Sequence, residues 1–114
     1  MKLLIVEDSP SVRRVIRSIV ATLADEVYEC EGGADALPAY AAHKPDWALM
    51  DIAMKKMNGI TATKLIKDQY PDAKIIIITN FDEADLRESA LQAGACGYVL
   101  KENLFELRRL LQDM

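Results

Sequence analysis

Five side chains with charged or hydroxyl groups stand at the ends of short apolar runs in this sequence: Glu7, Asp8, Asp51, Thr79 and Lys101. Each run is short and apolar, which predicts a buried strand. In a parallel sheet the carboxyl ends of all strands meet at one edge. We therefore expect three acids, a hydroxyl and an ammonium group to surround a single crevice.

The three acids indicate a cation site. Carboxylates held within a few ångströms of one another resist ionisation unless a cation compensates their charge. Mg2+ suits such a site because it binds oxygen ligands, takes only one or two protein carboxylates and keeps several waters. Mg2+ and Lys101 could then neutralise the oxygens of a phosphoryl group, while Asp51 accepts that group as an acyl phosphate.

Taken one at a time, these side chains have ordinary structural explanations. The acid pair at residues 7 and 8 could cap a helix and compensate its dipole. Asp51 or Thr79 could end a strand by chance, and Lys101 could be a solvated surface lysine. These separate explanations do not account for the arrival of all of them at one sheet edge. His43, the single histidine, stands on an alanine-rich segment and is predicted to be a surface residue distant from that edge.

Apolar and amphipathic segments alternate along the chain. Strands are predicted at residues 2–7, 27–30, 47–51, 74–79 and 96–100. Helices are predicted from Asp8-Ser9-Pro10 to about residue 23 and at 34–43, 60–69, 82–93 and 104–114, and Gly94 is predicted to cap the fourth of them. The first helix would have Asp8 or Ser9 as its N-cap, with Val15 on its apolar face and Arg13 outside that face. Pro38 would cost about 3 kcal/mol inside the second helix, so we expect a kink or a late start there.

This alternation predicts parallel strands joined by right-handed crossovers, and thus an α/β fold with helices on both faces of an open, doubly wound sheet. The first and fourth strands are the most hydrophobic and should flank the Asp51 strand. The order 2-1-3-4-5 satisfies this and places the topological switch where Asp8 and Asp51 would meet. At 114 residues, the chain is predicted to be one domain, residues 1–114, with no separate output domain.

Composition excludes several classes of protein. Fourteen basic and eighteen acidic residues give a formal charge of -4, and no basic tract forms a nucleic-acid surface. The longest apolar stretch is too short to span a membrane and no cleavable leader is visible, so a cytoplasmic protein without membrane contact is expected. Cys30 and Cys96 lack metal-ligand spacing and a CxxC motif, and we expect two buried free thiols on opposite sheet edges.

Taken together, the order and separation of these motifs resemble those of the receiver domains of two-component response regulators. The resemblance spans essentially the whole chain and rests on Glu7-Asp8, Asp51-Ile52-Ala53-Met54, Met57-Asn58-Gly59, Thr79, Gly94-Ala95-Cys96-Gly97-Tyr98 and Lys101. It implies a flavodoxin-like fold. It also implies a phosphoacceptor domain that assists its own phosphorylation and dephosphorylation, rather than an enzyme with a separate substrate.

The resemblance implies a donor and a metal for this site. Asp51 would accept phosphate from a partner sensor histidine kinase or a small phosphodonor. Glu7, Asp8 and Asp51, together with the backbone carbonyl of Ala53, would hold Mg2+.

A switch is implied as well. Thr79 would hydrogen-bond the phosphoryl group and Lys101 would pair with it. Tyr98 would turn inward behind Thr79 and change the surface of the fourth helix, the last strand and the last helix. A partner protein or a second copy of the chain would bind that surface, so the resemblance leaves open whether the domain forms a homodimer.

Three positions depart from the pattern of the family. Lys55 stands where proline is common, and Asn80 is larger than the usual residue after Thr79 and could narrow access to the acceptor. Glu102 also replaces a proline whose peptide bond is often cis; a cis bond before another residue costs about 3 kcal/mol, so we expect trans. The Lys101-Glu102 pair and the overall sequence resemble the subfamily whose members usually carry a helix-turn-helix DNA-binding domain. We therefore expect either an excised receiver domain or a stand-alone regulator.

Rival functions have weaker support in the sequence. Phosphatases of the Asp-x-Asp class use a second aspartate as general acid, but that position is Ala53, which cannot donate a proton. A flavin-binding module would need a Gly, Ser and Thr run where this chain has Glu7-Asp8-Ser9-Pro10. A pseudo-receiver that is never phosphorylated usually lacks the acceptor or the acid pair, and both are present here.

Overall fold

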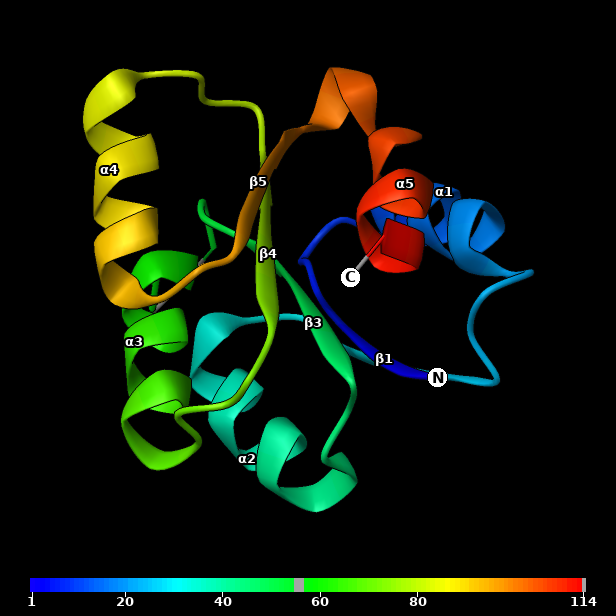
Figure 1. The fold of residues 1–114 in the computed structure, drawn as a ribbon, viewed down its shortest axis with the longest axis horizontal. Helices are drawn as coiled ribbons and strands as arrows, with labels where there is room; N and C mark the ends of the chain where they lie inside the picture. Colours follow the sequence, from blue (N-terminus) through cyan, green and yellow to red (C-terminus); the bar gives the residue numbers. More distant parts are fainter. Residues whose placement is uncertain (55–56, 114) are drawn as a thin grey trace.

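The computed structural model describes residues 1–54 and 57–113 and shows a parallel sheet between two layers of helices (Figure 1). The strands are β1 Lys2–Val6, β2 Glu26–Cys30, β3 Trp47–Asp51, β4 Ile75–Thr79 and β5 Gly97–Leu100. They pair in the order β2-β1-β3-β4-β5, and every neighbouring pair is parallel. The predicted fold class and strand order are confirmed.

Helices cover both faces of the sheet. They are α1 Pro10–Val20, α2 Gly33–His43, α3 Gly59–Gln69, α4 Ala84–Ala93 and α5 Glu106–Asp113, with a short 3-10 helix, η1 Lys101–Asn103, before α5. Helices α1 and α5 pack on one face and α2, α3 and α4 on the other (Figure 1). The central strands are therefore buried on both faces, which explains why they read as continuous apolar runs.

Alternate residues of each central strand enter different halves of the core. In β4, Ile75 and Ile77 face the α2, α3 and α4 layer, whereas Ile76 and Ile78 face α1 and α5. All four are essentially inaccessible to solvent. Burial of such a side chain contributes about 1.5–3 kcal/mol relative to exposure, so this strand fixes the centre of the sheet.

Helix boundaries follow capping residues where the sequence supplies them. Ser9 is the N-cap of α1 and accepts a hydrogen bond from the Val12 amide (3.4 Å), with Pro10 as the first helical residue. Gly94 ends α4 in the left-handed conformation (φ 109°), as predicted. The first, fourth and fifth helices are shorter than predicted, and the last is preceded by η1.

Of the two alternatives predicted for Pro38 in α2, a kink or a late start, the late start is wrong. This helix begins at Gly33, one residue earlier than expected, and continues through Pro38. Its buried face, which includes Ala36 and Tyr40, packs on the sheet. That packing offsets the single backbone hydrogen bond that proline cannot donate.

Three side-chain placements also differ from the prediction. Val15 is 49% exposed, so it does not lie on the buried face of α1. Arg13 is half-buried instead of lying outside. Cys96 is exposed because it precedes the edge strand β5. Cys30 is half-buried at the end of the opposite edge strand, and burial raises the pKa of its thiol to about 11.

Within the described ranges, no helix is long and apolar enough to cross a membrane.

Candidate functional site

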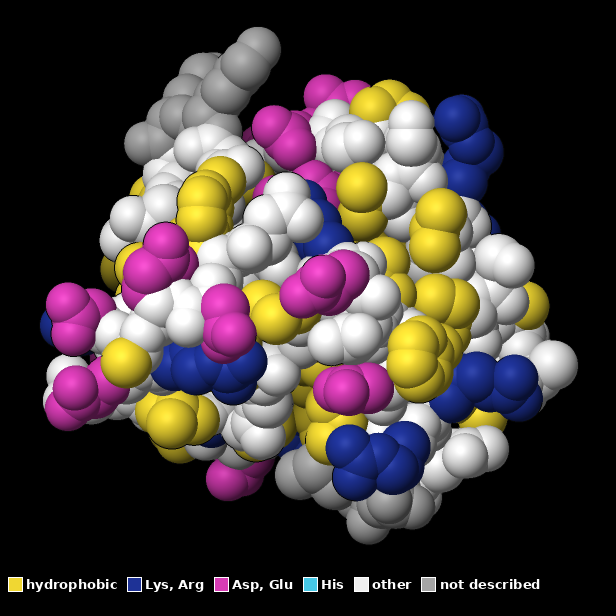
Figure 2. Space-filling model, turned by 90° about the horizontal axis from the view of Figure 1, so that it is seen from above, with side chains coloured by type: hydrophobic (Ala, Val, Ile, Leu, Met, Phe, Trp, Pro, Cys, Tyr) yellow, Lys and Arg dark blue, Asp and Glu magenta, His cyan; other side chains and the backbone are white. Residues whose placement is uncertain are grey.

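The carboxyl ends of four neighbouring strands carry the predicted site residues. Glu7 follows β1, Asp51 ends β3, Thr79 ends β4 and Lys101 follows β5. The parallel register aligns these ends, since Asp51 pairs with Ile78 in β4. Figure 2 looks onto this edge from above and shows acidic side chains gathered around a basic one near the middle of the face.

The three predicted metal-binding acids lie together. One carboxylate oxygen from each of Glu7, Asp8 and Asp51 lies within 4.8 Å of the others. Glu7 is fully buried and Asp51 is 2% exposed, whereas Asp8 is exposed. Two buried carboxylates this close together require a compensating charge.

Lys101 supplies part of that compensation. Its Nζ lies 2.7 Å from Glu7 Oε1 and 3.3 Å from Asp51 Oδ2. Burial alone would lower the pKa of the Lys101 ammonium, but pairing with Glu7 and Asp51 outweighs that effect and raises it. The site therefore contains three acids and one firmly protonated lysine, which leaves an excess of negative charge.

The remaining carboxylate oxygens show where a cation would fit. The Ser9 amide donates to Glu7 Oε2 (3.2 Å), and the Ile52 amide donates to Asp51 Oδ1 (2.9 Å). Glu7 Oε1 is buried, and its partner is the Lys101 ammonium 2.7 Å away. Three carboxylates gathered beside a single lysine match the oxygen-rich donor set that Mg2+ prefers.

A glycine fixes the loop that follows Asp51. A Cβ atom at Gly59 would lie 1.8 Å from the Asp51 carbonyl oxygen, so only glycine permits this approach of α3 to β3. The Ile52 carbonyl accepts hydrogen bonds from the amides of Met54 (3.1 Å) and Gly59 (3.0 Å). Ala53 lies in this turn with an exposed side chain, and its role as a carbonyl ligand stays a prediction.

Thr79 and Tyr98 are linked through the main chain of one residue. The Phe81 amide donates to Thr79 Oγ1 (3.2 Å), and the Tyr98 hydroxyl donates to the Phe81 carbonyl (2.7 Å). Burial raises the pKa of Tyr98, against an opposing effect of Arg87, so the phenol stays a donor. The Thr79 hydroxyl is thus connected, through the Phe81 main chain, to Tyr98 in β5 and to the loop before α4.

Comparison with known proteins adds independent evidence. A family model described as the response regulator receiver domain matches residues 3–113. The chain belongs to this family.

Relatives of this receiver domain include two proteins from Bacillus subtilis. It is 40% identical over 104 residues to the uncharacterized transcriptional regulatory protein YhcZ, covering 90% of this chain and 49% of that one. It is 38% identical over 112 residues to the chemotaxis protein CheY, covering 97% of this chain and 92% of CheY. The receiver domain therefore spans about half the length of the first of these relatives and most of the second.

Solved structures agree with this assignment. The response regulator domain of Thermotoga maritima CheB is similar with a TM-score of 0.88 and 26% identity, over 99% of this chain and 94% of that one. A two-component response regulator of the LuxR family from Aurantimonas sp. SI85-9A1 is similar with a TM-score of 0.90 and 28% identity, over 98% of this chain and 82% of that one. The predicted family and fold are confirmed, and with them a part in two-component phosphoacceptor signalling.

The departures from the family pattern have different outcomes. The peptide bond between Lys101 and Glu102 is trans, as predicted, because none in the described residues is cis. Asn80 is exposed directly after Thr79, and its effect on access stays a prediction. Lys55 lies outside the described residues.

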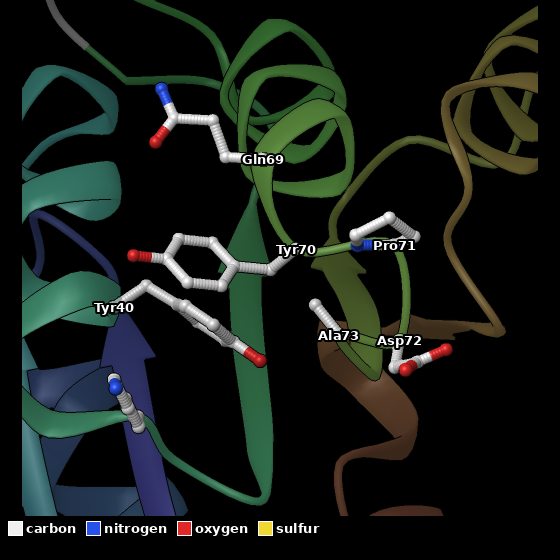
Figure 3. Close-up of a pocket in the computed structure, with 7 residues that line it drawn as sticks. Tyr40, Gln69, Tyr70, Pro71, Asp72 and Ala73 are labelled. Atoms are coloured by element: carbon white, nitrogen blue, oxygen red, sulfur yellow. The ribbon is translucent and has the colours of Figure 1, made fainter.

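Two features at the far ends of the helices lie away from the site. His43 ends α2 and stacks on Tyr28, with ring centroids 3.7 Å apart. A cavity of about 310 Å3 lies beside the end of α3, and Figure 3 shows the residues that line it: Tyr40, Lys44, Gln69, Tyr70, Pro71, Asp72 and Ala73. None of these residues belongs to the acid cluster.

Sequence reasoning missed two arginines of the receiver domain. Arg13 donates to the carbonyl of Glu7 (2.7 Å), although the helical pattern placed it outside. Arg87 of α4 lies over the Tyr98 ring, 4.6 Å from its centroid, and pairs with Asp82 at 2.7 Å. The available signal was weak: long side chains on a helix lean toward its N-terminus. For Arg13 that direction leads to residues 7–9 between β1 and α1, which we call the acid loop.

Proposed function

We propose that this receiver domain accepts a phosphoryl group on Asp51 from a sensor histidine kinase or a small phosphodonor, with Mg2+ as cofactor. One observation carries the proposal. The nearly buried Asp51 carboxylate lies 3.3 Å from the Lys101 ammonium and within 4.8 Å of two further acids, at the edge where the strands end. The domain would act as a phosphoacceptor that assists its own phosphorylation and dephosphorylation, rather than as an enzyme with a separate substrate.

The residues fit the metal that the family implies. Glu7, Asp8 and Asp51 would supply carboxylate oxygens, and the Ala53 carbonyl would complete the protein ligands. When bound, Mg2+ would neutralise charge on the phosphoryl oxygens. The gathering of these three carboxylates, with one oxygen of each within 4.8 Å of the others, supports this assignment from the protein's own geometry.

Three side chains of the site would have separate roles in the phosphoryl transfer. A carboxylate oxygen of Asp51 forms the new P–O bond as the P–N bond of the donor phosphohistidine breaks. Lys101 keeps its proton, because its pKa is raised, and pairs with a phosphoryl oxygen. Thr79 Oγ1 accepts from the Phe81 amide and so keeps its own hydrogen for the phosphoryl group.

The hydrogen-bond chain from Thr79 to Tyr98 supports the proposed switch. If Thr79 moves toward the phosphoryl group, the Phe81 main chain and the Tyr98 hydroxyl bonded to it must adjust. The change would reach the surface formed by α4, β5 and α5, which a partner or a second copy could read. A shift of a few kcal/mol is enough for such a population change.

The output of this switch is also part of the proposal. The first relative above is described as a transcriptional regulatory protein, and this supports an output through a DNA-binding domain. Direct contact of the receiver domain with nucleic acid or a membrane is not proposed. A cytoplasmic location and a homodimer remain predictions.

Intact-mass measurement after incubation with acetyl phosphate and Mg2+ tests the acceptor. We expect the native chain to gain the mass of one phosphoryl group, and Asp51→Asn to gain none. Asp68→Asn, which changes an exposed acid on α3, is the matched control and should be labelled like the native chain. Labelling of Asp51→Asn would overturn the acceptor assignment. No labelling of a native chain that binds Mg2+ would favour the pseudo-receiver.

A further inference from the structure

Arg13 connects the acid loop to the edge strand β2. It lies in the first turns of α1, and only 14% of its side chain is exposed. Nη1 donates to the Glu7 carbonyl at 2.7 Å, while Nε pairs with Glu29 Oε1 at 2.9 Å. One guanidinium group thus holds a main-chain oxygen of the site and a carboxylate of β2 at the same time.

Glu7 depends on such contacts because it lies just beyond the end of β1. Its amide extends the sheet by donating to the Cys30 carbonyl (3.1 Å), and its carbonyl is bound by Arg13. The Ser9 amide donates to its carboxylate. With the backbone held on both sides, the buried carboxylate is directed toward Asp51 and Lys101.

We propose that Arg13, oriented by Glu29, is a positioning residue that holds Glu7 for cation binding. This inference rests on the proposed function, because it assigns a further residue on which the affinity of the same metal site depends. Arg13 itself would touch neither the metal nor the phosphoryl group.

Charge and position make opposite predictions for the loss of Arg13. A guanidinium close to the acid cluster repels an incoming cation, so its removal by charge alone would tighten Mg2+ binding. Loss of the hydrogen bond to Glu7 would let the carboxylate move and would weaken binding. The direction of the change therefore separates positioning from electrostatics.

The test is Mg2+ titration by isothermal calorimetry. We expect Arg13→Ala to raise the Kd about tenfold, which corresponds to about 1.4 kcal/mol. Arg13→Lys keeps the charge but loses the fork of donors, and we expect an increase of about threefold. Arg17→Ala is the matched control: Arg17 also pairs with Glu29 (2.6 Å) but donates to the Val27 carbonyl, and its loss should change the Kd less than twofold.

Amide hydrogen exchange provides a second readout without metal. The Glu7 amide should exchange faster in Arg13→Ala than in the native chain, and Arg17→Ala should leave it unchanged. Equal or tighter Mg2+ binding by a folded Arg13→Ala would overturn the positioning role. If Arg13→Ala fails to fold, an unchanged Kd in Arg13→Lys would overturn it instead. A native chain that binds no Mg2+ would overturn the proposed metal site itself.

Discussion

Asp8→Asn tests whether the acid cluster stores repulsion that a cation relieves. The Asp8 carboxylate lies within 4.8 Å of an oxygen on Glu7 and on Asp51, and unit charges at this distance repel by about 0.9 kcal/mol in water and about 3.5 kcal/mol at an effective dielectric constant near 20. Asp8 is exposed, so the lower value applies to each repulsion.

One attraction is lost with the same charge. Asp8 directly precedes Ser9, the N-cap of α1, and an acid at a helix N-terminus contributes about 0.3–1 kcal/mol. The net effect of Asp8→Asn without divalent cations is therefore a free energy of unfolding about 1 kcal/mol higher. For a domain of this size, the unfolding temperature should rise by about 4 °C.

Thermal unfolding followed by circular dichroism measures this directly, in EDTA and in saturating Mg2+. In Mg2+ the native chain gains about 2.7 kcal/mol at a concentration one hundred times the Kd, so it should become the more stable of the two. Glu88→Gln, an exposed change on α4, should unfold like the native chain in both buffers. An Asp8→Asn variant that is no more stable than the native chain in EDTA would refute the reasoning.

Two further predictions concern the switch and the lysine. Tyr98→Phe removes the hydroxyl that donates to the Phe81 carbonyl, and we expect a loss of about 1 kcal/mol in urea unfolding with the fold intact; unchanged stability would mean that this bond contributes nothing. The pKa of Lys101 is raised above its usual 10.5, so its pairing stabilises the native state below that pH and is lost as the pH rises through the higher folded pKa. The stability difference between the native chain and Lys101→Met should therefore shrink above about pH 10.5 in urea unfolding, and parallel curves would contradict this.

Several features of the fold could be predicted from the sequence because they depend on local pattern. Apolar runs mark strands that are buried on both faces, and the change to a polar residue marks where each strand leaves the core. Parallel pairing then brings Asp51, Thr79 and Lys101 to one edge whatever their separation along the chain. Ser9 with Pro10 and Gly94 predicted a helix start and a helix end because capping is itself local.

Other features were decided only by the tertiary structure. Helical periodicity assigns a face to Arg13 but does not say how far its long side chain reaches back toward the acid loop. The same pattern placed Val15 in the core, although packing leaves it exposed. Whether α2 can contain Pro38 depends on the packing of the buried face of this helix against the sheet. Intrinsic helix propensities do not include that packing.

The contacts of the site itself also belong to the tertiary structure. The sequence determined that acids, a hydroxyl and a lysine would share an edge, because strand direction and burial follow from composition along short segments. It could not determine that Lys101 lies closer to Glu7 than to Asp51, or that the Phe81 main chain joins Thr79 to Tyr98. Those distances depend on strand register and on loop paths that are set when distant segments pack together.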